Sequence, residues 1–163
     1  MKKVYDEYVP KPRKESTVPE GAYVLRVLDM HDHPNRQYVA CVGDIADGPS
    51  AGTFSDPELN AGNAWRGHCL YLSYKSEFSL RHVRQWLDAM RYSNPGFNST
   101  QVWDEICDQE TKDFSPFIGK LFGAGIKDDR YDTNGTTYVQ SKVDIPTIAD
   151  YVRSGKFKGR RYA

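Results

Sequence analysis

The chain has 163 residues, of which 22 are basic (Lys and Arg) and 22 are acidic, so its formal net charge at pH 7 is zero. This balance argues neither for nor against nucleic acid as a partner, because only local basic patches could then bind it. Aromatic residues make up 13% of the chain and include 11 tyrosines. Tyrosine combines a ring with a polar tip, which suits a recognition surface as well as a core. The length predicts one soluble globular domain.

Residues 1–18 are rich in lysine and proline and predict an extended basic arm ahead of the domain. Alternating apolar side chains then predict three strands, at residues 22–29, 36–45 and 68–74. The polar stretch at residues 30–35 predicts a loop between the first two strands. A long connection rich in glycine and proline separates the second strand from the third.

Apolar residues at helical spacing predict a helix at residues 79–92, with several arginines on its opposite face. A short second helix is expected to be capped by Ser99 or Thr100. Asp104 and Glu105 are expected in its first turn, where the helix dipole favours negative charge.

A β-hairpin is the clearest signal in the second half of the chain. The dipeptide Asn134-Gly135 readily takes the two positive φ values of a type I′ turn. It separates a strand expected from residue 117 onwards from an alternating, β-branched strand at residues 136–143.

A short helix at residues 145–153 and a basic tail at residues 156–163 complete the chain, so we expect the domain to span residues 19–155. The predicted order β-β-β-α-α-β-β-α is mainly β with helices, an α+β chain. It matches an OB-like five-stranded barrel with a helix between strands three and four. Glycines in strand four suit a bent barrel strand: Gly119, Gly123 and Gly125.

The spacing of the cysteines and the absence of common catalytic motifs argue against several functions. Cys41, Cys69 and Cys107 form no CxxC pair, so we expect no disulfide framework and a reducing cytoplasm. No apolar run approaches the roughly 20 residues of a membrane span. His31 and His33 lack zinc-finger spacing, and no Walker A, GxSxG, GxGxxG or HExxH motif is present. We therefore expect no metal, no cofactor and no enzyme.

Several short segments stand in a recognisable order: Pro19 to Tyr23, Gln37 to Val39, Asp44 to Gly48 with Gly52 and Phe54, Ser93 to Phe97, Phe117 to Lys120, and Ala149 to Phe157. With this ordered set the chain resembles a family of small phage-encoded proteins of uncharacterised domain, encoded near replication and recombination genes. The resemblance implies a single-stranded-DNA-binding protein of the host cytoplasm. It covers most of residues 19–158, but the basic C-terminal tail departs from the acidic tail with which many single-strand binders recruit partner enzymes.

Binding of single strands on a barrel needs aromatic faces for the bases and cations for the phosphates. Tyr38 shares a strand face with Ala40 and Val42, so we expect its ring to be buried. The acidic residues near the hairpin turn argue against DNA passing close to it. The candidate nucleic-acid-binding residues are Arg26, Arg36, Trp65, Arg66, Tyr71, Tyr74, Lys75, Lys120 and Lys142.

We therefore expect a phage single-stranded-DNA-binding protein of replication or recombination, weakly sequence-selective. Its expected partners are single-stranded DNA and phage recombinase or replication proteins. We expect no membrane partner, and the sequence leaves the formation of homo-oligomers undecided. The alternative is a non-enzymatic adaptor that binds proteins, or a phage inhibitor of a host system. A third alternative, a metal-dependent nuclease, has only the Glu110-Thr111-Lys112 fragment in its favour, and this fragment lies in a charged loop.

Overall fold

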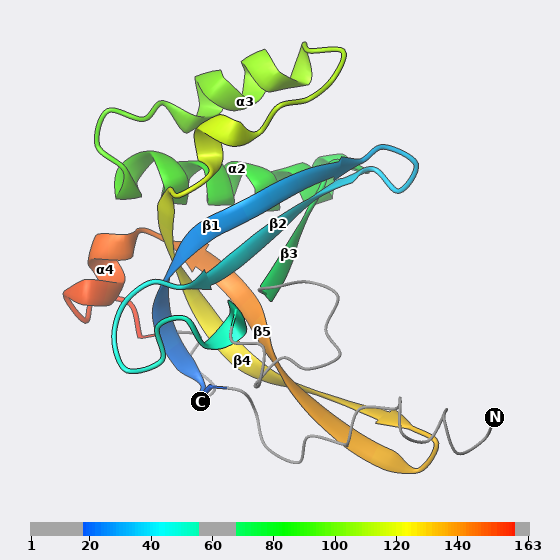
Figure 1. Ribbon diagram of the computed structural model, residues 1–163, viewed down its shortest axis with the longest axis vertical. Helices are drawn as coiled ribbons and strands as arrows, with labels where there is room; N and C mark the ends of the chain where they lie inside the picture. The colour runs from blue at the N-terminus through cyan, green and yellow to red at the C-terminus, as the bar shows by residue number, and fades with distance from the viewer. Residues whose placement is uncertain (1–17, 56–67, 159–163) are drawn as a thin grey trace.

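The computed structural model describes residues 18–55 and 68–158, so the N-terminal arm, Trp65, Arg66 and the end of the basic tail lie outside the described residues. Figure 1 shows a curved sheet with two helices across one end and a third helix beside it. The elements in chain order are β1 (Gly21–His33), β2 (Tyr38–Ile45), the 3₁₀ turn η1 (Thr53–Ser55), β3 (His68–Ser73), α2 (Glu77–Ser93), α3 (Ser99–Cys107), the 3₁₀ turn η2 (Ser115–Phe117), β4 (Leu121–Thr133), β5 (Thr136–Thr147) and α4 (Ala149–Arg153).

The strands form one antiparallel five-stranded sheet in the order β3-β2-β1-β4-β5. The predicted α+β class and element order are confirmed. The sheet is open: in the described part of the chain, no ladder joins its outer strands β3 and β5. The predicted barrel is therefore not closed, and β4 and β5 project together as a ribbon beyond the end of β1 (Figure 1).

The first strand is longer than predicted, because residues 30–33 continue it instead of forming a loop. A β-bulge between Val27 and Asp29 inserts one extra residue, Leu28, which breaks the apolar alternation. Beyond the bulge Met30 again faces the core. The simple period-2 pattern stopped at Leu28, so the sequence did not reveal the second half of the strand.

The hairpin turn was predicted correctly. Asn134 and Gly135 both have positive φ, 52° and 76°, as a type I′ turn requires. The predicted helix at residues 145–153 was wrong in its first turn, since β5 runs on to Thr147. Pro146 is tolerated there because β5 is an edge strand.

The helix starts also differ from the predictions. Ser76 caps α2, and its side chain forms a reciprocal capping box with Ser79. Asn98, not Ser99 or Thr100, caps α3 by accepting a hydrogen bond from the Gln101 amide. The first turn of α3 consequently holds no acidic residue, and Asp104 and Glu105 lie further along it.

The core lies between the sheet and the helices α2 and α3. Trp86 of α2 is 0% exposed and forms its centre. Its ring lies 5.4 Å from the Phe117 ring, 6.0 Å from that of Phe122 and 6.4 Å from that of Trp103, measured between centroids. Burial of rings of this size supplies most of the stability of such a layer.

The segment between α2 and α3 joins three elements of the fold. The Asn94 amide donates to the Leu121 carbonyl at 2.8 Å, while its oxygen accepts from the Leu121 amide at 2.9 Å. The Ser93 hydroxyl accepts from the Ala149 amide at the start of α4. Phe97 packs edge-on against Phe117. This segment is the Ser-Asn-Pro-Gly-Phe motif of the family resemblance, and its contacts have a structural role.

The small helix α4 packs closely against β4. A Cβ atom added at Gly123 would lie 2.8 Å from a methyl carbon of Val152 and 2.9 Å from one of Thr147. Glycine is therefore required here for close packing, in addition to any bending of the strand.

None of the helices in residues 18–55 and 68–158 has both the length and the apolar composition that a membrane span requires.

Candidate nucleic-acid interface

The face of β1, β2 and β3 that points away from α2 and α3, here called the outer face, carries a group of rings. Opposite residues of antiparallel strands point to the same side. The register pairs His33 with Tyr38 and His31 with Ala40. It also pairs Ala40 with Tyr71. These side chains therefore share the outer face, while Val39, Cys41 and Leu72 belong to the core on the other side.

The rings on the outer face touch one another in a row across the three strands. The centroids of His33 and Tyr38 lie 4.9 Å apart with the planes 36° from parallel. Tyr38 and Tyr71 lie 4.9 Å apart with the planes 84° apart, an edge-to-face pair. Tyr71 is 57% exposed, and His33 and Tyr38 are half-buried. The row, called the ring row below, consists of His33, Tyr38 and Tyr71.

Two cations lie at one end of the ring row. Arg36 is exposed in the β1–β2 turn, and its amide donates to the His33 carbonyl. Lys75 is exposed two residues beyond the end of β3. The next residue inward, Tyr74, donates its amide to the Gln37 carbonyl, so the two connections adjoin. The structure therefore brings together Arg36, Tyr71 and Lys75 from the predicted set.

Tyr74 points away from the ring row, although it was predicted to be a binding residue. Its ring packs against the core, and its hydroxyl donates to the Asp32 carboxylate at 2.8 Å. Burial of the hydroxyl, followed by the hydrogen bond and the negative charge of Asp32, raises the pKa of Tyr74 to about 12. The side chain is part of the fold, since it ties β3 to β1.

The other predicted cations are spread over the molecule. Arg26 is on the outer face, but in the strand register it lies opposite Asp44, roughly 14 Å along β2 from Ala40 at 3.4 Å per residue. Lys120 extends its ammonium group over the Phe97 ring, 5.0 Å from the centroid, on the helix side of the sheet. Lys142 is exposed on the ribbon. These residues do not form one basic groove with Arg36 and Lys75.

Asp44 has a buried side chain at the end of β2 and organises the connection that follows. Its carboxylate accepts hydrogen bonds from the amides of Ile45, Phe54 and Ser55 and from the Ser55 hydroxyl. Phe54 is thereby held in the core, 4% exposed, and contributes no open ring.

The two histidines do not converge with a cysteine. The His31 ring nitrogen Nε2 lies 2.7 Å from the Asp29 carboxylate on the outer face, whereas Cys41 is buried on the core side. Across residues 18–55 and 68–158, no cluster of three or more His, Cys, Asp or Glu side chains has an arrangement that could hold a metal ion.

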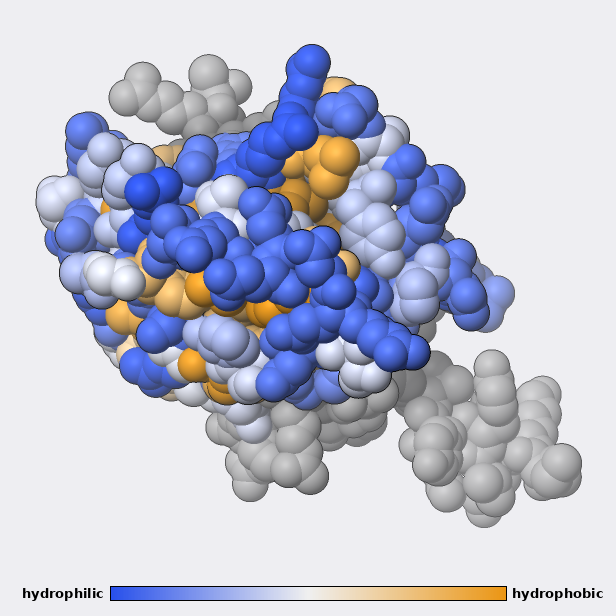
Figure 2. Space-filling model, turned by 90° about the horizontal axis from the view of Figure 1, so that it is seen from above, coloured by the Kyte–Doolittle hydropathy of each residue, from blue (hydrophilic) through white to orange (hydrophobic). Residues whose placement is uncertain are grey.

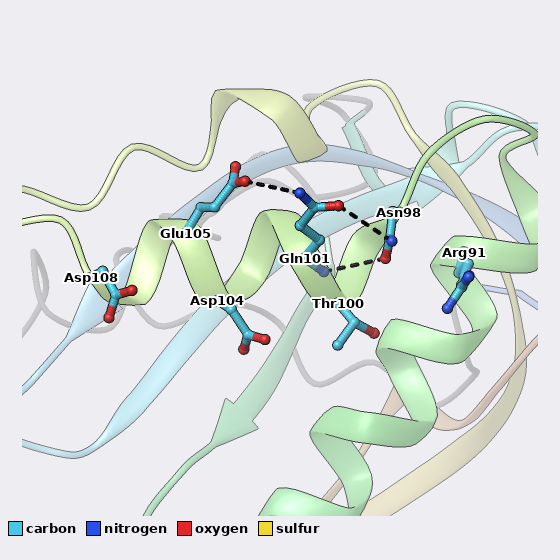
Figure 3. A pocket seen from close by; sticks show the side chains of 7 residues that line it. All are labelled: Arg91, Asn98, Thr100, Gln101, Asp104, Glu105 and Asp108. Atoms are coloured by element: carbon cyan, nitrogen blue, oxygen red, sulfur yellow. Dashed lines mark hydrogen bonds between the residues drawn. The ribbon is translucent and has the colours of Figure 1, made fainter.

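A shallow polar hollow of about 410 Å³ lies where the end of α2 meets α3. Figure 3 shows Gln101 bridging Asn98 and Glu105 along its side, with Arg91 on the facing helix. Carboxylates dominate this hollow, so it repels phosphate. The lining residues are Arg91, Asn98, Thr100, Gln101, Asp104, Glu105 and Asp108.

Sequence reasoning missed Tyr38 and His33. Both faces of β2 are apolar, so alternation could not show that Val39 and Cys41, not Tyr38 and Ala40, face the core. His33 was assigned to a loop because the bulge concealed the end of β1. The sequence did contain one signal for the ring row: His33 and Tyr38 flank a short polar turn, so they could have been expected to lie opposite each other.

A scan against models of known protein families gives no match, and no curated protein matches the chain. The family resemblance therefore stays an expectation. The function must be argued from the geometry of the outer face.

Proposed function

We propose that the chain binds single-stranded DNA on the outer face of β1, β2 and β3. The observation that carries the proposal is the ring row, in which three rings from three strands touch and Tyr71 is 57% exposed. Exposed rings of this size are uncommon on a globular surface. A base that stacks on such a ring contributes about 1–3 kcal/mol whatever its sequence, which fits weakly selective binding.

The strand arrangement supports the same proposal. Five antiparallel strands with helices between β3 and β4 resemble an OB-fold whose sheet is open between β3 and β5. OB-folds bind oligonucleotides on the face of strands two and three and on the loop between strands one and two. Tyr38, Tyr71 and Arg36 occupy these places.

The cellular role follows from the family resemblance. The protein would coat single strands during phage replication or recombination in the host cytoplasm, alone or as a homo-oligomer, and would meet phage recombinase or replication proteins there. Stacking and ion contacts are non-covalent, so this role needs no enzymatic step and no cofactor.

The test is a fluorescence anisotropy titration of a labelled single-stranded oligonucleotide, with the same sequence as a duplex for comparison. We expect saturable binding of the single strand at low salt and micromolar protein, and much weaker binding of the duplex, whose bases are stacked inside. Tyr71→Leu should lose most of the affinity. Tyr92→Leu is the matched control, because Tyr92 is similarly exposed, at 60%, but lies at the end of α2. Absence of single-strand binding at low salt would contradict the proposal.

A second candidate function is a protein-binding adaptor, favoured by α2. Phe78 is 69% exposed and Tyr92 60% exposed, roughly 21 Å apart along the helix at 1.5 Å per residue. Aromatic anchors within a polar surface are typical of protein interfaces. Figure 2 shows that hydrophilic residues cover most of the end of the molecule formed by α2 and α3. Capture of a phage or host protein that is lost in Phe78→Ser, without any oligonucleotide binding, would support this alternative.

A further inference from the structure

We infer that the outer face holds a single strand by its bases and makes few contacts with its phosphates, an inference that rests on the proposed function. A strand can be bound through ring stacking, through phosphate neutralisation, or through both. The two modes differ in what they recognise, because only stacking requires the bases.

Several basic side chains away from the ring row contact carboxylates, aromatic rings or carbonyl groups of the protein itself. Within residues 18–55 and 68–158, ion pairs join Arg84 to Glu77, Lys127 to Asp144, Arg130 to Asp128 and Arg153 to Asp47. Aromatic rings hold Lys120 and Lys156. Backbone carbonyls hold Lys112. The cations beside the ring row that enter no ion pair within this part of the chain are Arg36 and Lys75.

The second argument is the charge of the outer face itself. Asp29 points to this face and contacts His31 at 2.7 Å. Asp44 lies opposite Arg26 in the register, and although its carboxylate is buried it adds negative charge at that end of β2. Carboxylates therefore accompany the cations along the sheet, and the potential that would attract a phosphate backbone is small.

The third argument is the shape of the ring row. The planes of Tyr38 and Tyr71 are 84° apart at a centroid distance of 4.9 Å, so the two rings form a corner. A planar base that stacks on one ring meets the second ring edge to face, which is a favourable aromatic arrangement. His33 extends the Tyr38 side of the corner. The ligand class is an unpaired base on a flexible strand, since a duplex hides the faces of its bases.

The experiment compares an oligonucleotide of thymidines with an abasic oligonucleotide of equal length, which has the same phosphates and no bases. Affinity for the complete chain is measured by competition with a labelled probe at fixed salt. Stacking of a base in this corner predicts that the abasic strand binds about thirtyfold more weakly.

Abasic binding within about threefold of the thymidine strand would overturn the inference, since phosphates would then carry the affinity, and would leave the proposed function standing. Failure of both strands to bind would overturn the proposed function and the inference together.

Variants separate the rings from the cations. Tyr71→Phe keeps the ring and should retain binding, whereas Tyr71→Leu should bind the thymidine strand nearly as weakly as the wild type binds the abasic one. The double variant Arg36→Ala/Lys75→Ala should lower the slope of log K against log salt by about 1.4. This is the value expected when contacts with two phosphates of a single strand are lost. Its affinity loss should be smaller than that of Tyr71→Leu, with Arg81→Ala on α2 as the control cation. A larger loss from the cation variant would overturn the inference.

Discussion

Aromatic rings lie on both sides of the sheet, but they are packed differently. On the helix-covered face Trp86 is 0% exposed and lies within 6.4 Å of three further rings. On the outer face the row ends in Tyr71, which is 57% exposed. The first arrangement removes ring surface from water and stabilises the fold. The second leaves ring surface in contact with water, so it adds little to the burial that stabilises the fold.

This difference predicts that substitutions on the two faces have opposite consequences. Changes on the helix-covered face should lower the free energy of unfolding. Changes on the outer face should alter binding and leave the free energy of unfolding nearly constant.

The largest effect is expected at Trp86. Trp86→Ala removes a fully buried ring and leaves a cavity, which should cost about 3–5 kcal/mol of unfolding free energy. Trp86→Phe keeps an aromatic ring and should cost much less. The indole nitrogen of Trp86 has no hydrogen-bond partner among the described residues, so this change loses no hydrogen bond. Urea unfolding followed by circular dichroism measures both. A cost below about 1 kcal/mol for Trp86→Ala would contradict the assigned core.

The next effect is expected at Asn94, which connects α2 to the start of β4. Asn94→Ala leaves the Leu121 amide and carbonyl without their side-chain partner, which should cost about 2 kcal/mol. Asn94→Asp keeps the acceptor and loses the donor, so its loss should be intermediate. The same unfolding titration measures the difference. Equal stability of Asn94→Ala and the wild type would refute the proposed structural role of this motif.

A third effect depends on pH and concerns Tyr74. Its pKa of about 12 in the folded chain lies above the ordinary tyrosine value of 10.0, so the unfolded state loses this proton first. The stability contributed by the neutral hydroxyl is complete below pH 10 and should fall as the pH rises towards 12. Tyr74→Phe should flatten this fall. The pKa of Tyr23 is also raised by burial, so the comparison with the variant isolates Tyr74.

Absorbance of tyrosinate at alkaline pH gives an independent measurement of the same group. One tyrosine fewer should titrate late in Tyr74→Phe than in the wild type. Identical late titration in both proteins would show that the pKa of Tyr74 is not raised in the folded chain.

The smallest effect on stability is expected at Tyr71. Tyr71→Leu replaces a ring that is 57% exposed and should change the free energy of unfolding by no more than about 0.5 kcal/mol. The same variant should lose most of the oligonucleotide binding described above. Denaturation and anisotropy on one preparation provide both values. A stability loss as large as that at Trp86 would erase the difference between the two faces.

Much of the fold could be predicted from local chemistry. The Asn134-Gly135 turn is specified by the φ values that these two residues tolerate, and it was predicted correctly. The apolar spacing of α2 predicted its position, although the capping box moved its start to Glu77. The element order was correct for the same reason, since each element has its own period.

Parts of the candidate site could not be predicted, because they depend on contacts between distant residues. Lys120 resembled a groove cation, yet its ammonium group lies over the Phe97 ring on the other side of the sheet. Tyr74 resembled a stacking ring in the sequence. In the structure its hydroxyl donates a hydrogen bond to Asp32, which lies 42 residues earlier in the chain. Trp65 and Arg66 lie outside the described residues, so their assignment stays a prediction.

The sequence by itself determined the element order, the hairpin turn and the supply of aromatic side chains, because turn geometry and periodicity are local properties. The tertiary structure alone decided which rings are open. β2 is apolar on both sides, and its outer face was established only when Val39 and Cys41 joined the core that contains Trp86 of α2. Strand pairing then placed Tyr38 beside His33 and Tyr71, because cross-strand neighbours are set by register and not by position in the chain.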